Sequence, residues 1–332
     1  MAGVDATRYG SAVTERRRLA LVGNPTAGKG RAKQYATAAA ALLRAEGHDV
    51  EDLTGASAAE SLGRARAAVR AGVDALVVAG GDGMVHLGVN AVAGTSTPLA
   101  VLACGTGNDV ATTLGLPVHD LPASVRTVLD GTARRIDAAR QVQPTGTPIA
   151  EERWFAGVLC GGFDAVVNER ANRWRWPKGR LRYDLAIARE LPVFRPLAYE
   201  LELDGEPWTT QAMLVAVGNG PRYGGGMKIA PDASYDDGLL DVVVVGKMSV
   251  LGLVRAFPTI FTGQHIHHPA VTVRRARSVR LSASGITAYA DGERFGALPL
   301  TVEAVPGAVS VLVPRAPTSA TPSRASEAVD PA

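Results

Sequence analysis

DALVVAGGDGM (residues 74–84) joins an uninterrupted apolar run to a turn of three glycines and one aspartate. A second run of the same kind is PLAVLAC at residues 98–104. Such runs are typical of strands in the middle of a parallel sheet. Other strand and helix candidates alternate on the amino-terminal side, at residues 19–23, 31–46, 48–53 and 57–71. We therefore expect a doubly wound α/β domain, which binds ligands beyond the carboxyl ends of its strands.

The pattern changes after about residue 137, where strand-like segments are separated by Asp-Gly turns such as Asp204-Gly205 and Asp291-Gly292. This predicts a β-rich second domain over residues 138–303, with one helical insertion near 180–192. We expect the first domain to comprise residues 1–137, with 304–315 returning to it. The Pro/Ser/Ala-rich residues 316–332 predict a disordered tail.

Composition excludes several classes of protein. The chain has 332 residues, 46% of them hydrophobic, which excludes a wholly disordered chain and favours two domains. A net charge of +3 is too small for a dedicated nucleic-acid binder. Two cysteines exclude a disulfide scaffold and fit a reducing cytosol. No apolar run reaches the roughly 18 residues of a membrane span, and the amino terminus does not resemble a secretory signal. We expect a cytoplasmic protein.

Three glycine-rich polar turns follow strand candidates in the first half of the chain. GNPTAGKG at 23–30 nearly matches a P-loop, but Gly30 replaces the Ser or Thr that would hold magnesium. GGDGM at 80–84 presents Asp82, which could organise magnesium on ATP or polarise a hydroxyl, and GTGND at 105–109 ends in an amide and a carboxylate. Glycine turns before helices can hold phosphate oxygens. Each turn alone is also compatible with an ordinary junction, hairpin or helix cap.

In order and spacing, the three turns resemble the catalytic domain of the diacylglycerol kinase family, which includes bacterial lipid kinases and sphingosine and ceramide kinases. The family's NPxxGxG, GGDGT and GTxNDFA motifs correspond here to residues 24–30, 80–84 and 105–111. The resemblance covers about residues 18–315. It implies a nucleotide domain of the NAD kinase and phosphofructokinase type, a β-rich lipid domain, and an active site in the cleft between them. It also implies transfer of the γ-phosphate of ATP to a lipid hydroxyl, with diacylglycerol as the leading substrate.

The resemblance assigns roles to individual residues. It places the nucleotide beside Asn24, Pro25, Thr26, Ala27, Gly28, Thr54, Gly81, Asp82, Gly83, Met84, Val85, His86, Leu87, Thr106, Asn108 and Asp109. Asp82 and Glu293, the latter in an Asp-Gly-Glu segment, are the implied catalytic carboxylates. A carboxylate there would take the proton of the lipid hydroxyl as its oxygen attacks the γ-phosphate. Which of the two is the base stays open, and Asp-Gly alone is also a common hairpin turn.

PDASYDDGLLD at 231–241 resembles the family's PxAxxxDGxLD loop. The resemblance implies a magnesium ion held away from the catalytic centre, by Asp237 and by the main chain of Ser234 and Leu239. Oxygen ligands suit magnesium. A solvated acidic turn is the alternative interpretation.

Two positions depart from the family pattern. Met84 replaces the usual Thr of GGDGT, and Leu87 replaces the Glu expected three residues later. Three other functions therefore stay open: a sphingoid-base kinase, a soluble-substrate kinase of the NAD kinase type, and a non-catalytic lipid- or nucleotide-binding regulator.

A kinase of membrane lipids has to reach a bilayer. RANRWRWPKGRLR at 170–182 combines basic residues with two tryptophans and has no acid, which favours peripheral contact with an anionic membrane. A solvated basic loop is the main alternative, and nucleic acid is not expected as a partner. A homodimer is a further hypothesis for the assembly.

Overall fold

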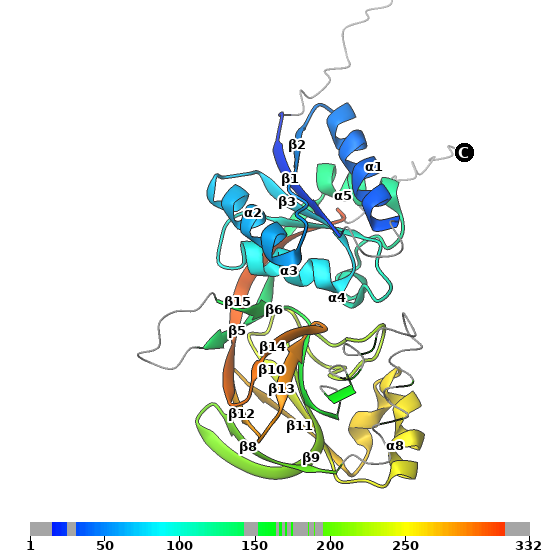
Figure 1. The fold of residues 1–332 in the computed structure, drawn as a ribbon, viewed down its shortest axis with the longest axis vertical. Coiled ribbons are helices and arrows are strands. Elements are labelled where there is room, and N and C mark those ends of the chain that lie inside the picture. Colours follow the sequence, from blue (N-terminus) through cyan, green and yellow to red (C-terminus); the bar gives the residue numbers. More distant parts are fainter. Residues whose placement is uncertain are drawn as a thin grey trace, which may run out of the picture.

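The computed structural model describes residues 15–24, 31–142, 152–163 and 195–315, together with the single residues Val166, Val167, Arg170, Trp174, Leu185 and Arg189. These residues form two lobes (Figure 1). In the described part, no helix has the length and apolarity needed to cross a membrane. The predicted tail (316–332) lies outside the described residues, as do most of segment 170–182 and most of the predicted helical insertion near 180–192, of which Leu185 and Arg189 are described as helical.

The first lobe is built on parallel strands in the order β2-β1-β3-β4. Its strands and helices are β1 (Arg18–Gly23), α1 (Arg31–Ala45), β2 (Asp49–Asp52), α2 (Ala58–Arg70), β3 (Ala75–Gly80), α3 (Asp82–Val92), β4 (Leu99–Ala103), α4 (Asp109–Thr113) and α5 (Leu121–Asp130). The carboxyl ends of β2 and β3 are followed by α2 and α3, and that of β4 is followed by a bend before α4. The arrangement is the one that places ligands at that edge of the sheet.

Both faces of this sheet are covered by helices, as Figure 1 shows. Leu76 and Val78 of β3 pack in one core with residues of α2 and α3, whereas Ala75 and Val77 pack in a second core with residues of α1 and α5. Successive side chains of a strand point to opposite faces, so a strand buried on both faces is apolar throughout. This confirms the predicted doubly wound α/β fold.

The second lobe is β-rich, as predicted. Its elements are β6 (Trp154–Phe155), β7 (Val158–Gly162), β8 (Leu197–Leu203), β9 (Glu206–Gly218), β10 (Leu240–Gly246), α8 (Val250–Ala256), η2 (Phe257–Ile260), η3 (Gln264–His267), β11 (Val271–Ala276), β12 (Ser278–Ser282), β13 (Thr287–Ala290) and β14 (Glu293–Ala297). Strands β7, β8 and β10 pair antiparallel with β9. The β13–β14 hairpin pairs with β7 through β13 and lies on the side of the lobe that faces the first lobe (Figure 1).

Two long strands join the lobes. β5 (Thr132–Val142) pairs antiparallel with β15 (Leu300–Val313), and β15 also pairs with β12 of the second lobe and, in parallel, with β4 of the first. One carboxylate fastens this junction, because Asp137 accepts hydrogen bonds from the amides of Gly238 and Gly307, each at 2.7 Å. The two lobes are therefore held through one continuous sheet. The residue boundaries of the two domains stay predictions.

Candidate active site

The glycine-rich turns after β3 and β4 touch each other at the carboxyl edge of the first-lobe sheet. The amide of Cys104 donates a hydrogen bond to the carbonyl of Gly80 at 3.0 Å. A Cβ atom on Gly105 would overlap the backbone of Gly81. The two turns require glycine because their backbones are in contact, and this contact brings Asp82 and Asp109 to one place.

Asp82 is the first residue of α3. Its Oδ1 accepts a hydrogen bond from the amide of Val110 at 3.3 Å, and a Cβ atom on Gly107 would lie 2.5 Å from its Oδ2. Burial, together with the nearby carboxylates of Asp109 and Asp291, raises the pKa of Asp82 to about 6. No Lys or Arg among the described residues forms an ion pair with Asp82. The crowding of like charges here favours binding of a cation.

Asp109 connects the first lobe to a loop of the second. The side chain is buried, and its two oxygens accept hydrogen bonds from the amides of Gly225 and Gly226, each at 2.7 Å. Both glycines have positive φ angles, of 83° and 107°, which glycine adopts without strain. Burial raises the pKa of Asp109, and these two hydrogen bonds and Arg222 oppose the increase. Neither Gly225 nor Gly226 is among the residues predicted for the site from the sequence.

A second contact between the lobes joins α3 to the β13–β14 turn. Nδ1 of His86 lies 3.1 Å from Oδ2 of Asp291. The same carboxylate accepts hydrogen bonds from the amides of Ala156 at 3.2 Å and Gly157 at 2.9 Å. Asp291 therefore fixes the hairpin that carries Glu293 against the helix that carries Asp82. The resemblance had implied a nucleotide contact for His86, and this pairing gives it a partner on the other lobe.

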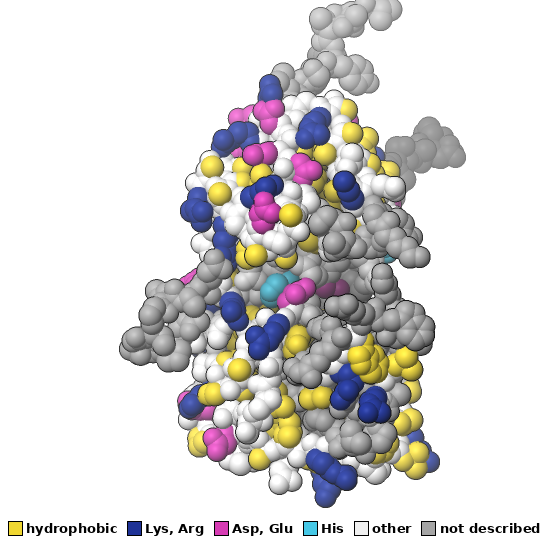
Figure 2. Space-filling view, in the orientation of Figure 1, with side chains coloured by type: hydrophobic (Ala, Val, Ile, Leu, Met, Phe, Trp, Pro, Cys, Tyr) yellow, Lys and Arg dark blue, Asp and Glu magenta, His cyan; other side chains and the backbone are white. Residues whose placement is uncertain are grey.

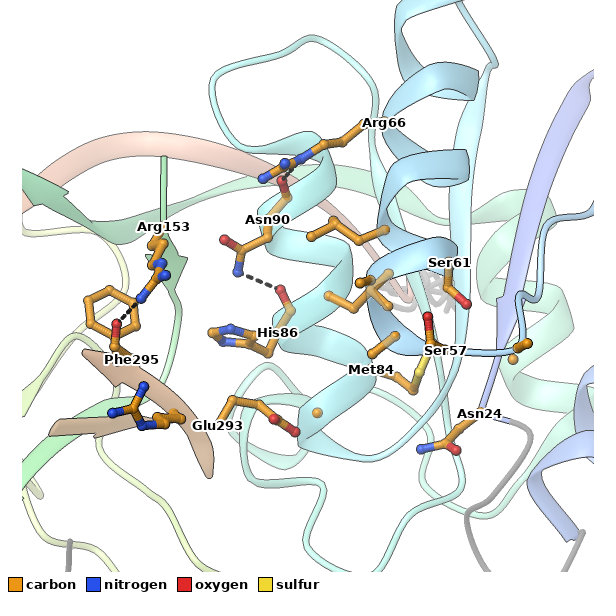
Figure 3. A pocket seen from close by; sticks show the side chains of 18 of the residues that line it. Asn24, Ser57, Ser61, Arg66, Met84, His86, Asn90, Arg153, Glu293 and Phe295 are labelled. Carbon is orange, nitrogen blue, oxygen red and sulfur yellow. Dashed lines mark hydrogen bonds between the residues drawn. The ribbon is translucent and has the colours of Figure 1, made fainter. Parts of the chain in front are cut away.

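Glu293 is exposed and extends from β14 towards the first turn of α3 (Figure 3). A Cβ atom on Gly83, the residue after Asp82, would lie 3.3 Å from Oε1 of Glu293. Gly83 and Glu293 both line a cavity of about 550 Å³ between α2, α3 and β14. Asn24, Met84, His86 and Leu87 also line this cavity. The structure thus brings the two predicted catalytic carboxylates, one from each lobe, to the same end of α3.

Several predicted nucleotide-site residues support the turns. Thr54, after β2, accepts a hydrogen bond through Oγ1 from the amide of Gly23 at 2.9 Å. Asn108 is buried and holds its own turn through two hydrogen bonds with the backbone of Gly105, at 2.9 and 2.8 Å. Thr106 is exposed at the tip of that turn. Pro25, Thr26, Ala27 and Gly28 lie outside the described residues.

The two positions that depart from the family pattern are both buried. Met84 and Leu87, like Val85 between them, belong to the first-lobe core with α2 and α3. Met84 also packs directly against Gly80, where a Cβ atom would overlap its side chain. The apolar residues at positions 84 and 87 therefore pack the start of α3 against the sheet.

Tyr235 lies in the acidic loop over residues 231–241 and is close to the carboxylates between the lobes. It is buried, its main-chain carbonyl accepts a hydrogen bond from the amide of Asp137 at 2.7 Å, and its hydroxyl packs against Gly220. Burial raises the pKa of Tyr235, and the charges of Asp291 and Asp82 raise it further. Tyr235 is not among the residues predicted for the site, although a lone aromatic side chain between acids is a signal for it.

Asp236 and Asp237 of the acidic loop are paired with arginines of the second lobe and of β5. Oδ2 of Asp237 forms an ion pair with Arg275, and its Oδ1 accepts a hydrogen bond from the amide of Leu239 at 3.0 Å. Oγ of Ser234 lies 2.5 Å from Oδ1 of Asp236. Within the described ranges, no group of three His, Cys, Asp or Glu side chains is arranged to hold a metal ion. The loop residues are close together, and a magnesium ion at this loop stays a prediction.

Two family models match the chain. The diacylglycerol kinase catalytic domain matches residues 18–141, and the YegS C-terminal NAD kinase beta sandwich-like domain matches residues 157–313. Together they span both lobes, and the first contains the three glycine-rich turns. Glu293 lies in the second.

Proteins named diacylglycerol kinase are similar over most of the chain. That of Mycobacterium tuberculosis is 42% identical over 293 residues, which cover 88% of this chain and 94% of the relative. That of Bacillus subtilis is 28% identical over 287 residues, covering 85% and 92%. A crystal structure of a diacylglycerol kinase from Bacillus anthracis matches the fold with a TM-score of 0.69 at 24% identity, over 90% of this chain and 98% of that one. The order of the turns, the two lobes and these relatives show that the chain belongs to the diacylglycerol kinase family.

Proposed function

We propose that this chain is an ATP- and magnesium-dependent lipid kinase that phosphorylates the free hydroxyl of diacylglycerol. Its relative at 42% identity bears the name of that activity. The observation that carries the proposal is the position of Glu293, an exposed carboxylate of the second lobe that faces Gly83 beside Asp82. Phosphoryl transfer depends on positioning and on charge stabilisation, and such a meeting of two lobes supplies both.

Glu293 is the proposed general base. It lines the cavity and is exposed, so a substrate hydroxyl can reach it. Its carboxylate takes the hydroxyl proton as the lipid oxygen forms a bond to the γ-phosphorus, and the bond from that phosphorus to the β,γ-bridging oxygen breaks to release ADP. Asp82 is less suited to this role because it is mostly enclosed by the turn that contains Gly107 and accepts the amide of Val110.

Asp82 is the proposed magnesium ligand. It is a half-buried carboxylate with no Lys or Arg ion-pair partner among the described residues, and hard carboxylate oxygens suit magnesium. Asp109, fixed by the amides of Gly225 and Gly226, lies beside it and adds negative charge. When bound, magnesium neutralises charge on the β- and γ-phosphates. The residues present therefore fit a magnesium–nucleotide complex.

The nucleotide is proposed to lie over the three turns. Asn24, Gly83 and Met84 line the cavity next to the first turn of α3. The exposed Thr106 lies at the neighbouring turn, whose position Asn108 fixes. Free amide groups at a helix start favour phosphate oxygens. The predicted contribution of residues 25–28 belongs to the same proposal.

The test is transfer of labelled γ-phosphate from ATP, with magnesium, to a panel of lipids in mixed micelles, with NAD as a soluble acceptor. We expect labelled phosphatidic acid from diacylglycerol. Label on a sphingoid base or on NAD would replace the proposed substrate with that acceptor. Binding of ATP without transfer to any acceptor would contradict the kinase and favour a regulator.

A further inference from the structure

One helix of the second lobe buries none of its own residues. This helix is α8, and the 3-10 helix η2 continues it directly. The exposed large apolar side chains of this region are Val250, Leu251, Val254, Phe257 and Phe261, which we call the α8 patch. Leu251 is 56% exposed and Val254 is 52% exposed. The three- and four-residue spacing from Val250 to Val254, Phe257 and Phe261 places these side chains along one face of the helical segment.

The α8 patch lies in a region without acidic residues. Between Asp241 and Asp291 the sequence contains no Asp or Glu. Of the cations in this stretch, Arg275 and Arg280 lie on β11 and β12 and pair with acids of other segments. Lys247 and Arg255 flank the patch, are exposed, and form no ion pair with the described residues. Figure 2 shows yellow apolar side chains with dark blue basic side chains over α8, at the lower right. The exposed cations Lys247 and Arg255 are therefore complementary to an anion-rich partner.

The size of the α8 patch favours a bilayer over a protein. A stable protein interface takes about 20–30 residues from each side. The two helices cover only residues 250–260. Short helical segments with apolar and basic side chains are of the kind that lie in the interfacial region of anionic membranes.

The α8 patch is joined to the active site by hydrogen bonds. The carbonyl of Ile260, at the end of η2, accepts the amide of Lys228 at 3.0 Å, and Nε2 of the buried His265 in η3 lies 3.0 Å from the carbonyl of Ile229. Residues 228 and 229 directly follow the loop whose Gly225 and Gly226 amides bind Asp109. The helical unit therefore contacts one end of a short segment whose other end contacts Asp109, the neighbour of Asp82.

We propose that the α8 patch docks on the surface of anionic bilayers and sets the second lobe against the membrane. Val250, Leu251, Val254, Phe257 and Phe261 enter the interfacial region, while Lys247 and Arg255 contact anionic headgroups. This inference concerns membrane binding and stands apart from the lipid that is phosphorylated. It places membrane contact on a described helix, in addition to the segment 170–182 that the sequence indicates.

The experiment is co-sedimentation of the full chain with vesicles of equal parts phosphatidylcholine and phosphatidylglycerol, and with vesicles of phosphatidylcholine alone. We expect the wild type to bind the anionic vesicles. The double variant Leu251→Asp/Val254→Asp should bind the anionic vesicles at least about tenfold more weakly, because two apolar side chains are replaced by anions. Leu42→Asp is the matched control, since Leu42 is 43% exposed on α1 of the other lobe. It should bind as the wild type does.

A second variant separates docking from misfolding. Lys247→Glu/Arg255→Glu leaves every apolar side chain in place and should weaken binding to the anionic vesicles by about tenfold or more. Thermal unfolding of all variants checks that they fold. Folded variants of both kinds that bind like the wild type would overturn the proposal, as would a wild type that binds neither vesicle. A concentration-dependent dimer in light scattering that the Leu251/Val254 variant loses would also overturn it, because the partner would then be a second copy of the chain.

Discussion

Two acid-rich regions of this molecule differ in how their carboxylates are compensated. On the loop over residues 232–241, Asp236 lies 3.4 Å from Arg134, and Arg275 pairs with Asp237 and lies 3.5 Å from Asp241. Between the lobes, Asp82 and Asp291 have no such arginine among the described residues. These two arginines compensate part of the charge of the loop, although burial and the charges of Asp237 and Asp232 still raise the pKa of Asp241 to about 6. No arginine among the described residues compensates Asp82 in this way.

The comparison shows that acid density alone does not identify a functional site. Both regions contain several carboxylates, and those of the loop lie much closer together in the sequence. The site between the lobes differs because its carboxylates come from segments far apart in the chain and because no arginine among the described residues pairs with Asp82. An uncompensated charge of this kind costs stability and is typical of functional sites.

We expect the largest effect on activity from replacing Glu293, the proposed general base. Glu293→Gln should lower kcat for diacylglycerol by about 10²–10⁴-fold, because the general base is lost while the cavity keeps its shape. Nucleotide affinity should change little. Steady-state kinetics together with nucleotide titration measure both, and near-normal turnover by the variant would remove Glu293 from its proposed role.

A smaller effect should follow from moving Asp82 without changing its charge. In Gly107→Ala, the new Cβ atom would lie 2.5 Å from Oδ2 of Asp82, so the carboxylate has to shift. We expect kcat to decrease by about 10²-fold. The matched control is Gly63→Ala in α2, where a Cβ atom meets open space. Equal activity of the two variants would show that the position of Asp82 is not critical.

The carboxylates crowded around Asp82 should also affect the free energy of unfolding. Because the folded state raises the pKa of Asp82 from 3.8 to about 6, the ionised carboxylate destabilises the fold at pH 7.5. Asp82→Asn should therefore increase the free energy of unfolding at pH 7.5, without magnesium, by about 1–3 kcal/mol. The gain should disappear as the pH decreases through 6 to below about 4, where Asp82 is protonated in both states. Denaturant unfolding at several pH values measures it, and a destabilised variant at pH 7.5 would contradict the electrostatic argument.

The smallest effect is expected on the compensated loop. Asp236 is 61% exposed and its partner Arg134 is 44% exposed, so their ion pair is screened by solvent. Asp236→Asn should change the free energy of unfolding by less than about 0.5 kcal/mol and leave kcat unchanged. A large loss of activity in this variant would give the loop a catalytic role and remove the distinction between the two regions.

The local sequence predicts the first lobe well because its signals are local. The runs at 74–80 and 98–104 become β3 (Ala75–Gly80) and β4 (Leu99–Ala103), which are buried along their whole length. Glycine-rich turns follow both strands, and glycine is needed there because the backbones of Gly81 and Gly105 are in contact. Strand periodicity and turn dipeptides likewise indicate the β-rich second half.

The contacts between the lobes could not be predicted in this way. His86 and Asp291 are 205 residues apart, and Asp109 and Gly225 are 116 apart. A short segment of sequence does not indicate which distant loop will donate hydrogen bonds to its carboxylate. The resemblance supplied Asp82 and Glu293 as candidates, and the structure adds the pairing that brings them to one end of α3.

The most direct measurement is calorimetric titration of ADP into the wild type, Asp82→Asn and Asp237→Asn, each with and without magnesium. If Asp82 holds the magnesium–nucleotide complex, magnesium should strengthen ADP binding to the wild type and to Asp237→Asn, and should not strengthen it in Asp82→Asn. A magnesium effect that persists in Asp82→Asn and is lost in Asp237→Asn would place the functional metal on the acidic loop, in contradiction to the proposed site between the lobes.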